Sequence, residues 1–293
     1  MKRIVILIAV VAMFFTAAGQ PYRDANRPYA YMGVTLGGGL NTMLYSMEGG
    51  RQTPGLGIDL GVHYTHFFSS LGFGLGFHYT SANAYATYNF DEVTNGLTHA
   101  DNPGAHYNLT THYDNWRERQ NIIVLGLPVE IFYRAHVGGG RHFIAGLGVE
   151  VDLPMRGSYS GAGGSYTTSG VFPALGTYTV SDMPEHGFST YTEVPDTRIS
   201  DLRAGFSLLA DLGMRLPLGP GGGVYIGLYG SYGLTDLLND PEGGPLLTID
   251  SHNSQHIIYS GTYTYGAGSG GSALNLLRVG VKVGIDLASP MDN

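Results

Sequence analysis

Histidine offers this chain its widest choice of chemistry, because an imidazole binds metals and carries protons near neutral pH. The chain has 293 residues, with 11 histidines and no cysteine. His63 and His78 fall on the same face of two neighbouring predicted strands, diagonally about 7–8 Å apart, with Asp59 nearby. Such a group could bind a metal or act as a base. No H-x-H or HExxH spacing supports it, so we expect both imidazoles to hydrogen-bond to carboxylates instead.

The remaining chemical candidates are dispersed. Ser81, near His78, is the nearest candidate for the Ser/His pair of a lipid-modifying enzyme, and no catalytic motif surrounds it. The other histidines near predicted loops are expected to be solvated rather than metal-bound: His99, His106, His112, His186, His252 and His256. The glycine-rich stretches GGGLN and GPGGG are followed by no helix that would bind phosphate. We therefore expect no catalytic residues, no metal and no cofactor.

The elements that carry these residues show a strand pattern. In GLGIDLGVHYTHFF, residues 55–68, apolar side chains alternate with glycine, aspartate, histidine and threonine, which is typical of a strand with one apolar face. The same alternation predicts eight strands near residues 29–41, 54–68, 71–90, 111–134, 142–159, 200–218, 224–238 and 273–287.

The connections between these strands alternate in length. Short glycine-rich or serine-rich turns at residues 68–70, 135–141 and 219–223 separate long segments at residues 42–53, 91–110, 160–199 and 239–272. Outer-membrane barrels have an even number of strands, short periplasmic turns and long outer loops. With 13% charged residues and no run of about 18 apolar residues beyond the N-terminus, the pattern predicts an all-β, eight-stranded antiparallel transmembrane up-and-down barrel.

Charged residues at the alternate strand positions that would face inward distinguish a barrel from a soluble sandwich. Several charges on one inward face would be unfavourable in an apolar core but suit a barrel whose apolar face meets lipid. The predicted interior network, structural rather than catalytic, contains Asp59, Glu150, Asp152, Arg203, Asp211, Arg215, Arg278, Lys282 and Asp286. Because acidic and basic side chains are nearly equal in number, we expect them to pair across the barrel and close it. Arg215 and Arg278 are expected to hold this network together, with Asp211 and Asp286 among their partners.

One proline interrupts the pattern. Pro128 lies inside the fourth predicted strand and cannot donate a ladder hydrogen bond, so we expect a bulge there. The inward positions of Glu130 and Arg134 depend on the shape of that bulge.

The N-terminus predicts export. Lys2 and Arg3 precede a 12-residue apolar stretch and small residues up to Gly19, which together indicate a signal peptide at residues 1–19. Its removal takes the formal net charge from −8 to −10, which disfavours nucleic-acid binding. Residues 20–28 then form a short lead-in, residues 29–288 the barrel and residues 289–293 a tail.

The motifs YMGVTLGGGLNT, GVHYTHFFSSLGFGLGFHYTSANA, VLGLPVEIFYR and LLRVGVKVGIDL resemble the membrane domain of OmpA-type outer-membrane proteins. The resemblance covers most of the mature chain and implies a barrel in the outer membrane of a Gram-negative cell. We expect no peptidoglycan-binding domain of the kind found in many such proteins. The last predicted strand also lacks the terminal aromatic residue often used as an assembly signal.

The function we expect is therefore structural or scaffolding and non-enzymatic, as an accessory to a larger outer-membrane assembly. The expected partners are outer-membrane lipids and other outer-membrane proteins, reached through residues 160–199 and 239–272. A lipid-modifying enzyme at the outer rim and a small channel are the alternatives.

Overall fold

The computed structural model of the protein describes residues 29–47, 49–99, 102–176, 178–199, 202–218, 221–239, 245–250, 253–262 and 273–290. The predicted signal peptide and lead-in lie outside these residues. No helix within them has the length and apolar character needed to cross a membrane.

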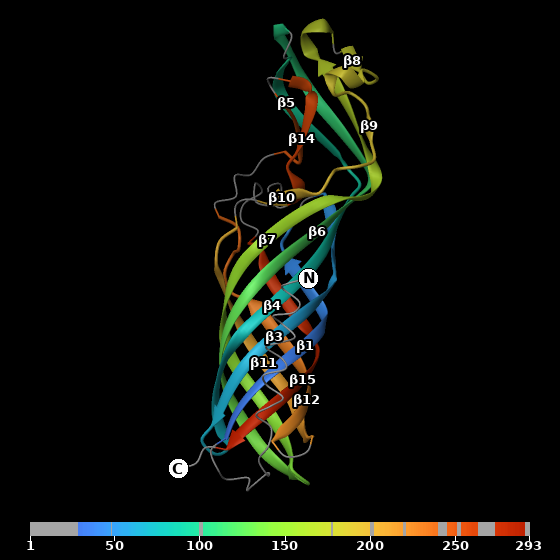
Figure 1. The fold of residues 1–293 in the computed structure, drawn as a ribbon. Coiled ribbons are helices and arrows are strands. Elements are labelled where there is room, and N and C mark those ends of the chain that lie inside the picture. Colours follow the sequence, from blue (N-terminus) through green and yellow to red (C-terminus); the bar gives the residue numbers. More distant parts are fainter. Residues whose placement is uncertain are drawn as a thin grey trace, which may run out of the picture.

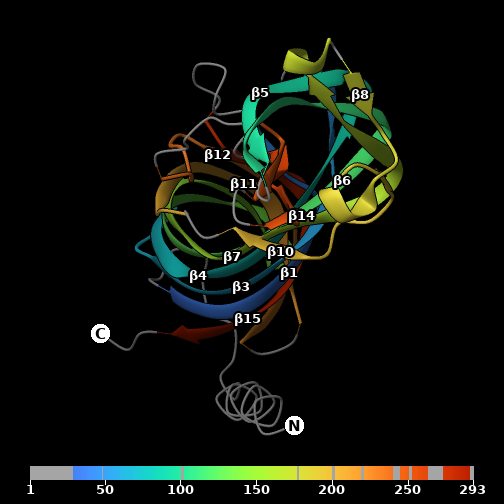
Figure 2. The same cartoon turned by 90° about the horizontal axis from the view of Figure 1, so that it is seen from above.

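Eight long strands form a closed antiparallel ring (Figures 1 and 2). Each strand pairs with its neighbours in chain order, β6 pairs with β7, and the first strand pairs with the last, Tyr29 opposite Pro290. The all-β prediction and the ring of eight are confirmed. The strands are β1 (Tyr29–Leu44), β3 (Leu56–Phe67), β4 (Leu71–Tyr88), β6 (Asn102–Gly138), β7 (Arg141–Phe172), β11 (Gly205–Pro217), β12 (Gly222–Gly233) and β15 (Asn275–Pro290). Because β15 continues to Pro290, residues 289 and 290 belong to the ring rather than to a tail.

The segments predicted as long loops contain further regular structure. They hold β2 (Gly50–Pro54), β5 (Asp91–His99), β8 (Tyr178–Val180), β9 (Thr190–Tyr191), β10 (Thr197–Ile199), β13 (Leu247–Asp250), β14 (Asn253–Tyr259) and the 3-10 turns η1 (Pro173–Leu175) and η2 (Pro184–His186). β6 and β7 run on well beyond their predicted ends and, with β5, β8 and β9, form a projection above the ring (Figure 1). We call residues 91–114 and 165–191 the arm.

The lower part of the ring is apolar on its outside. In β4 the exposed side chains are Leu71, Phe73, Leu75, Phe77 and Tyr79. The other strands of the ring continue this belt, for example from Phe206 to Met214 in β11 and from Leu277 to Ile285 in β15. Nine residues are about the length that a tilted strand needs to cross a bilayer.

Above the belt the two faces of the wall exchange character. In β4 the outward residues become Ser81, Asn83, Tyr85 and Thr87, whereas the inward ones become three alanines and Tyr88, all fully buried. In β6 the outward residues above Ile123 are an asparagine and two arginines, and the inward ones include Trp116, Ile122 and Val124. The strands keep their alternation while the apolar face moves from the outside to the inside. We call this height the inversion level.

The bulge predicted at Pro128 is wrong. β6 keeps one register with β4 and with β7 across this proline, which pairs with Glu150. The register shifts instead between Ile123 and Val124, where β7 carries one extra residue, the exposed Met155. Because no residue is inserted at Pro128, Glu130 and Arg134 remain inward and buried.

Candidate functional site

The interior of the ring holds a group of ions around Arg278 of β15, which is 1% exposed. Its guanidinium donates to the carboxylate of Glu150 of β7. It donates as well to the hydroxyl of Ser231 of β12, at 2.6 Å. It also donates to Thr80 of β4 at 3.2 Å and lies 3.6 Å from Asp152 of β7. One cation therefore connects side chains from four strands across the ring. Gly126 leaves room for Glu150, because a Cβ there would lie 2.4 Å from the Glu150 carboxyl carbon.

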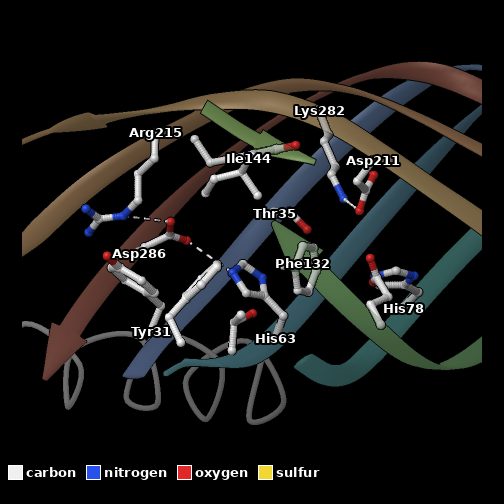
Figure 3. A pocket seen from close by; sticks show the side chains of 14 residues that line it. Tyr31, Thr35, His63, His78, Phe132, Ile144, Asp211, Arg215, Lys282 and Asp286 are labelled. Atoms are coloured by element: carbon white, nitrogen blue, oxygen red, sulfur yellow. Dashed lines mark hydrogen bonds and ion pairs between the residues drawn. The ribbon is translucent and has the colours of Figure 1, made fainter. Parts of the chain in front are cut away.

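Two more ion pairs lie nearer the short turns (Figure 3). Lys282 Nζ is 2.5 Å from Asp211 Oδ2, and Arg215 Nε is 3.3 Å from Asp286 Oδ2. The other oxygen of Asp286 is 3.1 Å from His63 Nε2. Asp211 and Asp286 were expected among the partners of Arg215 and Arg278, and of these pairings only Arg215 with Asp286 is found. Asp211 pairs with Lys282 instead, and Arg278 pairs with Glu150 and Asp152 of β7.

Little space remains between these side chains. The cavity lined by His63, His78, Asp211, Lys282 and Asp286 has a volume of about 50 Å³. Ligand pockets usually measure about 300–1,000 Å³, and a single water occupies at least about 10–15 Å³ measured in this way. This cavity therefore accommodates a few waters among paired ions rather than a substrate.

The predicted chemical candidates are placed apart from one another. His78 Nδ1 lies 2.7 Å from Glu150, so His63 and His78 each contact a carboxylate as expected. Asp59 accepts from Thr80 at 2.6 Å. Ser81 lies on the outer face and accepts from Asn121, whereas His78 points inward; the two cannot form a catalytic pair. Within the described residues, no cluster of three or more histidine or acidic side chains could hold a metal ion.

The outer histidines that are described make local contacts. His112 lies 2.5 Å from Asp91, and His106 lies 3.3 Å from Thr98. His252 lies outside the described residues.

The assignment of Arg203 to the interior network is wrong. Regular pairing of β11 begins at Gly205, and Arg203 lies above it with 48% of its side chain exposed. Its Nε donates to the backbone oxygen of Asp236 at 3.0 Å. Arg134, which is not part of the predicted network, is buried and donates to Tyr31 at 3.0 Å and to the Ser69 carbonyl at 2.8 Å.

Above the inversion level, a second site closes the ring. Residues 245–250 and 253–262, here called the cap, include the antiparallel pair β13–β14, and β14 lies over the ring when viewed from above (Figure 2). Leu246, Leu247 and Tyr259 of the cap pack into an apolar cluster that also contains Trp116 and Ile122. The top of the interior is therefore filled by side chains.

A fully buried carboxyl group connects the cap to the wall. Glu118 of β6 accepts from Tyr259 at 2.8 Å, from Gln120 at 2.7 Å and from the Thr262 amide at 3.1 Å. Trp116 in turn donates to Tyr259 at 2.8 Å. Burial raises the pKa of Glu118 above its ordinary value despite these donors, because removing a carboxylate from water disfavours its charged form.

A second carboxyl group connects the cap to the arm. Glu92 of β5 accepts from the Leu246 amide at 3.0 Å and from Tyr113 at 3.1 Å, and burial raises its pKa as well. Sequence reasoning missed both glutamates because it treated their surroundings as a strand end and a loop. The signal was present in β6, where Trp116, Glu118 and Gln120 alternate with Arg117, Arg119 and Asn121.

Together these features define a closed eight-stranded antiparallel ring with an ion-filled interior, an apolar outer belt and a capped upper end. No family model matches the chain, and no curated protein matches it. Among solved structures, Neisserial surface protein A (NspA) is similar with a TM-score of 0.37 and 8% identity, over 88% of this chain and 96% of that one. The evidence for the closed ring is the pairing between its strands.

Proposed function

We propose that this protein is a non-enzymatic barrel of the outer membrane of a Gram-negative cell, with a structural or scaffolding role. The observation that carries the proposal is the inversion level. An outward apolar belt suits hydrocarbon, and a polar outside over an apolar inside suits water. A wall with both, one above the other, fits a barrel that crosses a bilayer and continues into the aqueous phase.

The scaffolding role is supported by what fills the two halves of the ring. Within the described residues, paired ions occupy the lower interior and apolar side chains the upper interior, which supports a barrel that is closed to solutes. The arm is the largest described feature beyond the ring, and Leu175 and Tyr178 are 68% and 61% exposed. Exposed apolar side chains beyond the membrane would suit contact with another outer-membrane protein.

Reconstitution separates this proposal from the channel alternative. The purified protein should insert into phosphatidylcholine bilayers, migrate differently on gels before and after heating, and give no steady conductance across a planar bilayer. A stable ohmic single-channel current would refute the closed scaffold and favour the channel. Failure to insert would refute the barrel proposal itself.

A further inference from the structure

Exposed arginines gather on one wall just above the inversion level. Arg51 of β2, Arg117 and Arg119 of β6, and Arg156 of β7 are all exposed. Strand register places Arg51 opposite Thr87 of β4 and Thr87 opposite Arg117. The first three therefore share the outer face of neighbouring strands, in a chain whose formal net charge is −8.

Two of these arginines line a cleft over the outer face of the paired strands β6 and β7. The cleft has a volume of about 250 Å³ and is lined by Arg119, Asn121, Ile123, Arg156, Ser158, Ser160 and Asp196. It thus offers two guanidinium groups, an amide and two hydroxyls. Guanidinium groups bind phosphate oxygens through paired hydrogen bonds, more specifically than a lysine does.

The acidic residue in the cleft, Asp196, is only weakly paired with an arginine. Asp196 lies 2.8 Å from Arg156, and their side chains are 57% and 55% exposed. Ion pairs this exposed contribute little to stability, so a phosphate group competes readily for Arg156. Within the described residues no carboxylate pairs with Arg119. Arg117 is held beside it by the ring of Tyr85, with the guanidinium carbon 4.1 Å from the ring centre.

The height of the cleft indicates which anion it would meet. Ile123 lines its lower end and begins the apolar belt, which continues through Leu125 on the same face of β6. In a membrane barrel, this is the height at which lipid headgroups border the acyl chains. A ligand that is anionic above and apolar below fits this position better than a free anion does.

We propose that the cleft between Arg119 and Arg156 binds the phosphate-bearing headgroup of a lipid in the outer leaflet, with an acyl chain against Ile123 and Leu125. This inference rests on the proposed membrane location. It adds a specific ligand class and a specific wall to that location.

The test is lipid binding to the full protein in neutral detergent, using short-chain phosphatidic acid as the probe and native mass spectrometry as the readout. Each arginine near a membrane surface contributes about a fivefold gain in affinity for anionic lipid. R119Q and R156Q should each weaken binding by about fivefold, and the double variant by more. Arg141, exposed at the opposite end of β7, provides the control: R141Q should bind like the wild type.

Equal binding by the wild type and the double variant would overturn the inference. A parallel titration with inorganic phosphate tests the source of the anion. If free phosphate displaces the lipid at equal concentration, the ligand is a free anion and the lipid assignment is wrong. Insertion into phosphatidylcholine bilayers is measured separately, so a protein that inserts but shows no preference for phosphatidic acid refutes this inference and leaves the proposed barrel intact.

Discussion

Replacing Arg278 by methionine should destabilise the barrel far more than any exposed arginine replacement. Methionine keeps much of the side-chain length and removes the charge. The change leaves Glu150 and Asp152, which are 0% and 1% exposed, without their shared cation. It also removes a donor to Ser231 at 2.6 Å. The two carboxyl groups, which are neighbours on the inner face of β7, then lack a compensating cation and repel when charged.

The expected magnitude follows from burial. Removing one partner of a buried ion pair costs about 3–5 kcal/mol, because the other charge stays uncompensated. An exposed pair contributes about 0–1 kcal/mol. Arg156 provides a matched control, since its 2.8 Å contact with Asp196 joins two side chains that are both more than half exposed. R278M should thus lower the free energy of unfolding by about 3–5 kcal/mol, and R156M by less than about 1 kcal/mol.

The measurement is urea unfolding in neutral detergent, followed by far-UV circular dichroism. Fluorescence of Trp116, the single tryptophan, reports separately on the capped end. Adding E150Q and D152N to R278M should recover part of the loss, because the uncompensated charges are then removed. A loss for R278M no larger than that for R156M would refute the view that paired ions stabilise the interior.

Three further outcomes are expected. Leu208 and Val281, 49% and 61% exposed on the belt, should each cost about 2–4 kcal/mol when replaced by arginine in a bilayer. Asn95→Arg, exposed in the arm, should unfold like the wild type. An unchanged urea midpoint for both belt variants would show that the inward and outward faces are assigned the wrong way round. Because the chain has no cysteine, a single A174C in the arm should react with an impermeant maleimide on intact cells and G139C should not, and the reverse labelling would overturn the topology. The raised pKa of Glu118 means that its contribution to cap docking is complete below the ordinary carboxyl pKa and declines as pH rises through the raised value. Glu92 also contacts the cap and has a raised pKa, so protease cleavage within residues 245–262 should increase with pH in the wild type and vary little in the E92Q/E118Q double variant. A parallel increase in both would assign the effect to another group.

The alternation in the sequence was enough to find all eight strands of the ring, because side-chain parity is a local property. It also placed Lys282, Arg215 and Asp286 on inward faces. It could not identify which ions pair across the ring, since that depends on the stagger between strands that are distant in the chain. Arg203 was misplaced because parity was extended two residues beyond the point where β11 begins. Pro128 was wrongly expected to bulge, whereas its missing amide proton is accommodated without an inserted residue.

In the proposed membrane location, the inversion level would also fix how deeply the barrel is immersed. If the protein sank by one residue pair, Asn121 and Asn83 would enter hydrocarbon, and if it rose by as much, the lowest apolar rows would meet water. Both displacements act on every strand of the ring at once, so the barrel cannot adapt to a thicker or thinner bilayer by sliding. In a bilayer of a different thickness, the lipids next to the wall have to stretch or compress instead. The protein would then act as a local spacer for the membrane, and the height of the arm above the surface would stay constant from one bilayer to another.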